Sequence, residues 1–252
     1  SRNYSNWFPN LTLLWNKEPW AASLAYTCKT KRPSYSSLRN EVQYDNRYMY
    51  EGGDPYLRPT IAHDVSLDVM CNWISFGVEY LYEDNPIIWY ATLYRHQDIA
   101  FLRNMNFSSK QTMTAYVIAA PKFDWYQPTW QVFFQKPFFD AEKYGAPCGL
   151  SKPALGITWN NQFKLSSTWT SWVTLHANTT SYNAFRRYRS GYFASMRMVK
   201  TFFDEALTVN FYADDIFRSQ KDQWTMYGDH ATLTKDSYNS AREIGVRVVY
   251  KF

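Results

Sequence analysis

The sequence is poor in the residues that cross-link a fold or hold a metal ion. Its 252 residues include three cysteines, Cys28, Cys71 and Cys148. An odd count without C-x-x-C spacing favours neither a disulfide scaffold nor a zinc site. The histidines lack i,i+4 and H-x-H spacing, which favours solvated or wall-lining roles over metal binding or general-base catalysis, and no cofactor is expected. The four histidines are His63, His96, His176 and His230.

Long hydrophobic runs are also missing. No stretch of about 18 apolar residues occurs, so a transmembrane helix is excluded, whereas alternating strands of about 10 residues are allowed because only half of their side chains meet lipid. The net charge of +5 is modest. Scattered basic residues give little support to nucleic-acid binding and fit an anionic lipid surface equally well. Nucleophile-elbow, P-loop and dinucleotide motifs do not occur, and we expect no enzyme.

What the sequence has instead is aromatic residues in alternating patterns. Phe, Trp and Tyr make up 19% of the chain, although its mean hydropathy is −0.49. The clearest pattern is residues 240–252, where apolar and aromatic side chains occupy the even positions and mostly polar or small residues the odd ones. This period-2 strand ends on an aromatic residue, which is typical of the closing strand of an outer-membrane barrel. The residues assigned to barrel closure are Val248, Tyr250 and Phe252.

The same alternation predicts about 11 strands. They lie within residues 10–16, 23–29, 65–71, 74–82, 111–120, 130–138, 155–159, 165–177, 192–202, 207–213 and 244–252. We place a turn at Asn160 and Asn161. Connections alternate between two to six residues and about ten to thirty, as periplasmic turns and extracellular loops do in outer-membrane barrels. The long connections are residues 31–60, 83–110, 140–152, 179–189 and 217–239.

Aromatic rings are predicted to crowd the end with short turns, where a membrane interface would hold them. These residues are Trp7, Trp20, Trp73, Trp125, Phe163, Phe202, Phe203 and Phe252. The pattern predicts an all-β fold, an antiparallel transmembrane β-barrel. The alternative is a soluble β-sandwich, in which the apolar faces led by Val173 and Val248 would be buried against each other.

Several segments together resemble a known family. They are W-F-P-N-L-T-L-L-W near the start, K-R-P-S-Y-S-S-L-R-N at 31–40, G-G-D-P-Y-L-R-P at 52–59, D-D-I-F at 214–217 and the ending G-V-R-V-V-Y-K-F. In this order they resemble the C-terminal barrel half of TonB-dependent receptor-like outer-membrane proteins of Bacteroidota. Asp54 stands where that family usually has Asn.

The resemblance implies a barrel of 22 strands, filled by an N-terminal plug and driven by an inner-membrane TonB complex. With about 11 strands, residues 1–252 are expected to form the C-terminal part of such a barrel, the N-terminal strands and plug being absent from this chain. Ser1 follows no signal-peptide pattern, which we interpret as removal of a leader or as the start of a C-terminal part. The first and last strands should then pair with a preceding part of the polypeptide, because an open edge in lipid leaves backbone groups unpaired.

Two sets of candidate site residues follow. Aromatic side chains of the first two long loops offer rigid, amphipathic contact area for capturing a solute, or they pack the loops against one another. They are Tyr44, Tyr48, Tyr50, Tyr56, Trp89, Tyr90 and Tyr94. Four carboxylates, Asp64, Asp68, Glu79 and Glu83, are predicted to share the inner wall of one hairpin, with Lys29 on the strand before. They are candidate contacts for basic residues of a plug, or solvated lumen charge.

Three functions remain open at this point. The first is an outer-membrane receptor for energised uptake of a bulky solute, such as a metal chelate, oligosaccharide or peptide. The second is a passive or structural barrel that anchors surface lipoproteins or assembly factors. The third is a soluble carbohydrate-binding sandwich. The expected partners of the barrel are its N-terminal half and plug, outer-membrane lipid and lipopolysaccharide, surface lipoproteins and, by resemblance, the TonB complex. No nucleic acid is expected.

Overall fold

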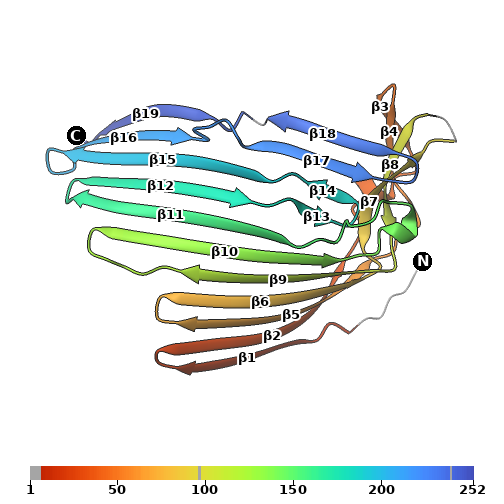
Figure 1. The fold of residues 1–252 in the computed structure, drawn as a ribbon, viewed down its shortest axis with the longest axis horizontal. Coiled ribbons are helices and arrows are strands. Elements are labelled where there is room, and N and C mark those ends of the chain that lie inside the picture. Colours follow the sequence, from red (N-terminus) through yellow and green to blue (C-terminus); the bar gives the residue numbers. More distant parts are fainter. Residues whose placement is uncertain (1–6, 96–97, 239) are drawn as a thin grey trace.

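The computed structural model describes residues 7–95, 98–238 and 240–252, and β-strands dominate these ranges (Figure 1). Two 3-10 helices interrupt them, η1 (Ser36–Leu38) and η2 (Glu142–Tyr144). No helix in the described ranges is long and apolar enough to cross a membrane. The long strands are β1 (Asn10–Lys17), β2 (Trp20–Lys31), β5 (Thr60–Cys71), β6 (Ile74–Asp84), β9 (Ser109–Ala119), β10 (Tyr126–Phe138), β11 (Ala154–Ser166), β12 (Trp169–Asn178), β15 (Gly191–Phe202), β16 (Leu207–Asp214) and β19 (Glu243–Tyr250).

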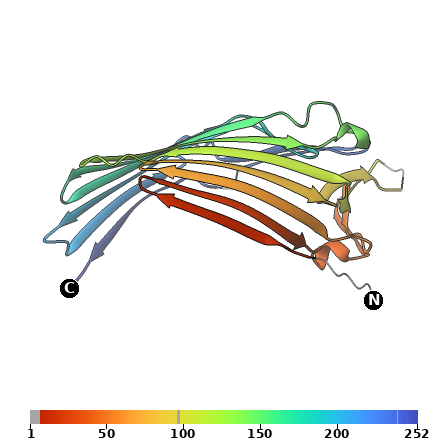
Figure 2. The same ribbon diagram turned by 90° about the horizontal axis from the view of Figure 1, so that it is seen from below.

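These strands form one 11-stranded sheet in the order β1-β2-β5-β6-β9-β10-β11-β12-β15-β16-β19. Every pairing in it is antiparallel. The sheet is curved, and its edge strands β1 and β19 do not pair with each other (Figure 2). The predicted all-β antiparallel architecture and its strand number are confirmed.

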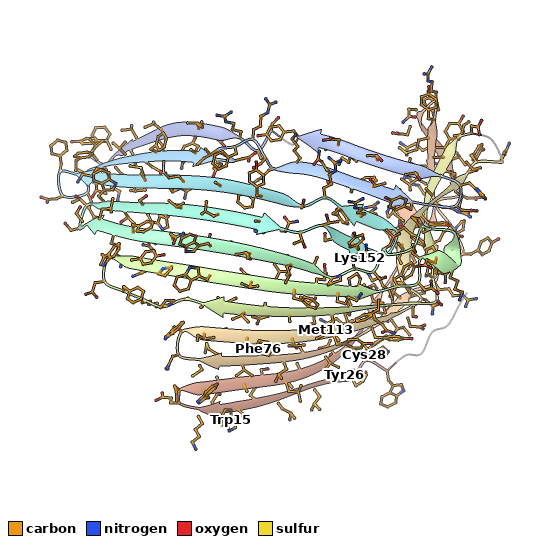
Figure 3. The ribbon with its side chains drawn as sticks, in the orientation of Figure 1. Trp15, Tyr26, Cys28, Phe76, Met113 and Lys152 are labelled. Carbon is orange, nitrogen blue, oxygen red and sulfur yellow. The ribbon has the colours of Figure 1, made fainter. Side chains whose placement is uncertain are left out.

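The sheet has one apolar face and one polar face. Successive side chains along a strand point to opposite faces, and paired residues of neighbouring strands point to the same face, so the alternation of each strand adds to that of its neighbours. One row of partners runs from Trp15 across β2, β5 and β6 to Val117 of β9, and Figure 3 labels two of its residues, Trp15 on β1 and Phe76 on β6. The row consists of Trp15, Ala22, Val69, Phe76, Val117, Val132, Ile157, Ala177 and Tyr192. The next row, one residue along, carries Ser23, Asp68, Gly77, Tyr116 and Asn178 among its members.

No second sheet covers the apolar face within the described ranges. Val246 and Val248 of β19 are 63% and 61% exposed, and Ile157 near the middle of the sheet is 54% exposed. A β-sandwich would bury these side chains between two sheets about 10 Å apart. The sandwich alternative is therefore excluded, and the apolar face has the exposure expected of a surface that meets lipid.

The turn predicted at Asn160 and Asn161 is wrong. Strand β11 runs unbroken through both residues to Ser166, and the chain turns two residues later, before Trp169. Asn161 is buried instead, where the Tyr126 hydroxyl donates to its Oδ1 at 2.7 Å and its Nδ2 donates to the Val173 carbonyl at 3.3 Å. Asparagine generally favours turns. Here these hydrogen-bond partners hold Asn161 within a strand.

The sequence pattern predicted loops for the long connections between strands. In the structure these connections contain secondary structure of their own. Their described residues form eight short strands in two four-stranded sheets, of order β3-β4-β8-β7 and β13-β14-β17-β18. The bounds are β3 (Val42–Asn46), β4 (Met49–Gly52), β7 (Ile87–Leu93), β8 (Ala100–Asn106), β13 (Ser181–Asn183), β14 (Arg186–Tyr188), β17 (Lys221–Tyr227) and β18 (Thr232–Tyr238). Together with residues 139–153 we call these strands the loop layer; it lies at the end of the sheet opposite the short turns (Figure 1).

The loop layer has a hydrophobic core of its own. Phe185 and Met226 are fully buried, and Gly228 approaches β7 so closely that the Asp229 N–H donates to the Ala91 carbonyl at 2.9 Å. A Cβ on Gly228 would overlap that carbonyl, which explains the glycine. The buried members of this loop core are Tyr90, Ala91, Leu102, Phe107, Phe139, Ala141, Ala146, Leu150, Ala184, Phe185 and Met226.

Aromatic rings line the short-turn end as predicted, with one exception. Tyr126 stacks between Trp125 and Phe163, at centroid distances of 5.5 and 5.0 Å. Trp7 does not belong to this group, because the chain enters β1 from the end nearest the loop layer, where the Trp7 carbonyl lies 4.0 Å from the Cys28 sulfur. Its place in the chain before the first strand, and not after it, decides this.

The cysteines are free, as the strand register predicts. Cys71 pairs with Trp20 at one end of β2, whereas Cys28 pairs with His63 near the other end. The two sulfurs are therefore too far apart along the strands to form a disulfide. Cys28, Cys71 and Cys148 are all thiols.

Candidate functional site

The first two long loops, which hold the predicted capture residues, are joined into one sheet. Strand β4 of the first loop pairs in parallel with β8 of the second, and Tyr50 lies beside Phe101 in that register. Sequence periodicity did not reveal this pairing, because β4 has four residues and its partner lies some fifty residues away in the chain. The pairing explains how aromatic residues from separate loops come together.

Four rings form a continuous row on one face of this sheet, and we call it the aromatic row. It consists of Tyr44, Tyr50, Tyr94 and Phe101. The centroid of Tyr50 lies 5.8 Å from Tyr44 and 4.9 Å from Tyr94, and Phe101 lies 5.5 Å from Tyr94. Three of these residues were predicted from the sequence, whereas Phe101 was missed because the alternation around it is weak.

Arginines lie over the rings of this region. The guanidinium carbons of Arg95 and Arg103 are 5.2 and 5.6 Å from the centroids of Tyr94 and Phe101. Arg47 lies 4.5 Å from the ring centroid of Tyr48 in the neighbouring turn. None of the three arginines forms an ion pair within the described ranges. The row is therefore an aromatic surface with unneutralised positive charge, suited to contact planar or anionic groups.

The remaining predicted capture residues divide into exposed and packed ones. Tyr48 and Tyr56 are 61% and 76% exposed. Trp89 packs partly against the loop core, and Tyr90 is buried in it. Burial raises the pKa of the Tyr90 hydroxyl, with a smaller contribution from Asp229. Because its hydroxyl donates to the Tyr144 carbonyl, Tyr90 packs the loop layer and offers no surface to a solute.

The four predicted carboxylates share the polar face of the β5–β6 hairpin, but their surroundings differ. Glu83 is buried and forms two ion pairs, in which its Oε1 accepts from Lys31 at 2.8 Å and its Oε2 lies 2.8 Å from the Lys110 ammonium nitrogen. The expected basic neighbour, Lys29, is on the same face but forms no ion pair in the described ranges. Glu83 is thus neutralised within this chain.

The other three carboxylates keep more of their binding capacity. Asp68 accepts the Tyr116 hydroxyl at 2.5 Å, whereas Asp64 and Glu79 make no side-chain hydrogen bond or ion pair with described residues. Gly77, beside Asp68 on the polar face, has no side chain, and this allows the Tyr116 ring to lie across it. Contact of Asp64, Asp68 and Glu79 with a plug stays a prediction.

The D-D-I-F segment has a structural role that the sequence did not reveal. Asp215 is fully buried just beyond β16, and its Oδ1 accepts the Ser219 N–H at 2.8 Å while its Oδ2 accepts the Tyr238 hydroxyl at 3.0 Å. Removal from water opposes ionisation of this carboxyl. The N–H groups of Ser219 and Gln220 and the Tyr238 hydroxyl outweigh it and hold the pKa of Asp215 below its usual value.

The closing strand has the two faces that its alternation predicts. Val248 pairs with Val209 on the apolar face, and the Tyr250 and Phe252 rings meet edge to face at 5.1 Å at the short-turn end. On the polar face the Tyr212 hydroxyl donates to Glu243 at 2.9 Å. Glu243 and Val248 therefore lie on opposite sides of β19, as expected for lumen and lipid.

The two sheet edges carry a topological constraint. Since β1 and β19 are the first and eleventh strands of an antiparallel sheet, they run in the same direction. Pairing them directly, or pairing two copies of the sheet edge to edge, would create parallel seams. Closure by antiparallel pairing requires an odd number of further strands, which agrees with the even strand numbers of bacterial outer-membrane barrels.

The histidines form no metal site among the described residues. His63 Nδ1 and His176 Nδ1 are hydrogen-bonded, at 2.8 Å each, to Tyr26 and Thr158. His230 lies exposed beside Asp229, and His96 lies outside the described residues. Within the described ranges no group of three or more His, Cys, Asp or Glu side chains is arranged to hold a metal ion.

Comparison with known proteins identifies the architecture. A model of the outer membrane protein beta-barrel family matches residues 1–250. No curated protein sequence matches the chain. Among solved structures, the siderophore receptor PirA from Acinetobacter baumannii is similar, with a TM-score of 0.61 and 10% identity over 98% of this chain and 41% of that receptor.

Two structures from Pseudomonas aeruginosa give the same result. PirA has a TM-score of 0.60 and 13% identity over 84% of this chain, and a mutant of the ferric enterobactin receptor PfeA in complex with enterobactin has a TM-score of 0.56 and 12% identity over 96% of this chain. The chain spans 39% of the length of each. At these identities the likeness shows the fold alone.

Proposed function

The chain belongs to the outer membrane protein β-barrel family, and from this premise we propose that it is the C-terminal part of an outer-membrane receptor for energised uptake of a bulky solute. Metal chelates, oligosaccharides and peptides are the solute classes considered. The observation that carries the proposal is the loop layer, which presents the aromatic row beside unpaired arginines on a barrel sheet of the siderophore-receptor fold. An enzyme would need a catalytic constellation, and the proposal assigns none.

Barrel closure is the second element of the proposal. The remaining strands pair with β1 and β19, and the interior is filled by a plug held in part by Asp64, Asp68 and Glu79 through charge-assisted hydrogen bonds. Neutralising these three carboxylates in the full-length protein should loosen the plug and raise passive leakage of a small dye. Unchanged leakage and plug retention would remove this contact.

Solute capture is tested by removing exposed rings of the first loop. The double variant Tyr44→Ala with Tyr48→Ala, made in the full-length protein, should reach the cell surface in normal amount but lose uptake. Growth would be scored with haem, ferric siderophores, maltooligosaccharides or short peptides as the sole source of iron, carbon or nitrogen. The control is Tyr35→Ala, whose side chain is 94% exposed and lies outside the aromatic row.

The outcomes separate the two barrel functions. Lost uptake at normal abundance supports capture, and its abolition by a protonophore supports energised transport. Normal growth on every tested solute in the double variant would end the capture role and favour a passive or anchoring barrel. Reduced abundance would show that these rings pack the loops.

A further inference from the structure

The loop sheet β3-β4-β8-β7 has a pocket on the face opposite the aromatic row. Its cavity volume is about 360 Å³, and Trp89, Asn104, Gln43 and Glu51 are among the residues that line it. Gln43 pairs with Glu51, and Trp89 pairs with Asn104, so the members of each pair share a face. Tyr44 alternates with Gln43 and therefore points to the other side.

The rim of the pocket is held in place by η1. Asn104 donates to the Ser37 hydroxyl at 2.9 Å, which ties β8 to this helix across 67 residues of chain. The Asp54 N–H donates to the Ser37 carbonyl at 2.7 Å. A Cβ on Gly53 would overlap the carbonyl oxygens of Ser37 and Arg39, so glycine is required for this close approach. The two segments of family resemblance, 31–40 and 52–59, thus form one wall.

The polar groups of the pocket are mostly unused. Gln43, Glu41 and Glu51 make no side-chain hydrogen bond or ion pair with described residues. Arg39 uses only its Nε, which donates to the Ser36 carbonyl at 3.3 Å. The wall therefore offers carboxylate acceptors, guanidinium donors and an amide that does both.

This combination selects a particular ligand chemistry. A hydroxyl group donates and accepts at once, so a polyol can satisfy Glu51, Gln43 and Arg39 together. One cation against two carboxylates leaves no net positive charge to attract an anion. The Trp89 ring supplies a flat apolar wall of the kind that covers the C–H face of a pyranose. The volume equals about twelve waters at roughly 30 Å³ each, enough for one sugar ring.

We propose that this pocket binds one neutral sugar residue of a glycan. The site goes beyond the proposed uptake function, because it lies on the opposite face of the loop sheet from the aromatic row. The sugar belongs either to a free oligosaccharide or to the saccharide part of lipopolysaccharide, and both present the same hydroxyl chemistry.

The test uses the full-length protein in detergent and an array of neutral oligosaccharides together with purified lipopolysaccharide from the producing strain. The strongest ligand is then titrated by calorimetry. Glu51→Gln and Gln43→Ala should each weaken binding at least tenfold, and Phe203→Ala, which removes an exposed ring at the short-turn end of the sheet, should leave it unchanged. Preference for lipopolysaccharide over free oligosaccharide, or the reverse, identifies the source of the sugar.

Hydrogen exchange of the loop core serves as the folding check, and both pocket variants should keep wild-type protection because neither side chain is part of that core. The proposal is overturned if the folded protein binds no neutral sugar, or if both pocket variants bind the sugar as tightly as wild type. Sugar binding that persists in Tyr44→Ala with Tyr48→Ala while uptake is lost keeps this site distinct from the proposed capture surface.

Discussion

The main sheet and the loop layer treat the same residue types in opposite ways. On the sheet, Val246, Val248 and Ile157 are more than half exposed, whereas in the loop layer Phe185 and Met226 are fully buried. An ordinary water-soluble domain buries its apolar side chains because water surrounds it. The loop layer follows that rule, and the sheet follows the rule for a surface that meets lipid. The chain therefore has one region suited to lipid and one suited to water, and the two lie at different positions along its long axis (Figure 1).

The difference predicts where a substitution acts. In the loop layer an apolar side chain stabilises by filling a core, so truncation should be costly. On the apolar face of the sheet truncation leaves lipid in contact with the chain, so the costly change is the introduction of charge.

Phe185→Ala should have the largest effect. The ring lies 4.5 Å from Tyr90, 5.0 Å from Phe107 and 5.1 Å from Phe139, and its loss should cost about 3–5 kcal/mol. Hydrogen exchange should show faster exchange in β14 and β17 while β9 and β10 keep their protection. Phe203→Ala, at a ring that is 75% exposed, is the control. Equal loss in both regions would contradict a separate loop core.

Val248→Arg tests the lipid side of the comparison. Arginine at mid-depth on the lipid face should cost about 2–4 kcal/mol, whereas Val249→Arg, which points to the polar face, should be mild. Unfolding of the full-length protein from lipid vesicles in guanidinium measures the difference. Equal costs at the two positions would contradict the assigned faces.

Asp215→Asn probes the junction between the regions. An amide in place of the carboxylate brings a donor against the N–H groups of Ser219 and Gln220, and the change should cost about 1–3 kcal/mol. In the wild type the pKa of Asp215 is lowered on folding, so its stabilisation is complete above the usual value of 3.8 and is lost as pH falls through the folded value.

The pH dependence provides the measurement for Asp215. Protection of the Ser219 and Gln220 amides should decrease below pH 3.8 in the wild type, relative to amides of β10, and should not change in this range in Asp215→Asn. A wild-type decrease that begins well above that pH would show that another group is responsible.

Gly77→Ala should have the smallest effect. The added Cβ would overlap the Tyr116 ring, which must then move and weaken its hydrogen bond to Asp68, at a cost of about 1 kcal/mol. Gly191→Ala is the matched control, because a Cβ there meets its nearest neighbour, Asn178, at 3.5 Å. If both variants unfold alike, the cross-strand packing of Tyr116 on Gly77 contributes nothing measurable.

The sheet could be predicted from the sequence because apolar and polar residues alternate along a strand that has one face toward lipid and the other toward the lumen. The register of Asp64, Asp68, Glu79 and Glu83 on one face follows from that period and a short turn. The loop layer could not be predicted in this way. Its strands are three to seven residues long, and its pairings, such as β4 with β8, join distant segments.

Two single residues also could not be placed from the local sequence pattern. Tyr90 resembles its exposed neighbours in sequence, and its burial depends on Phe185, almost a hundred residues later. Asn161 resembles a turn residue, and the Tyr126 hydroxyl from another strand keeps it in β11. In both cases the deciding partner is a tertiary contact that local pattern does not encode.

The apolar face of the sheet should meet lipid, whereas the opposite face should not. The most direct test of this central claim compares neighbouring positions on β19 in a membrane. A fluorophore would be attached to Val246→Cys or Arg247→Cys in full-length protein whose native cysteines, Cys28, Cys71 and Cys148 among them, are replaced by Ser, and quenching by nitroxide-labelled lipid would be measured. If the apolar face contacts lipid, quenching should be strong at position 246, which lies on that face, and weak at position 247. Equal quenching at both positions, or stronger quenching at 247, would contradict this claim.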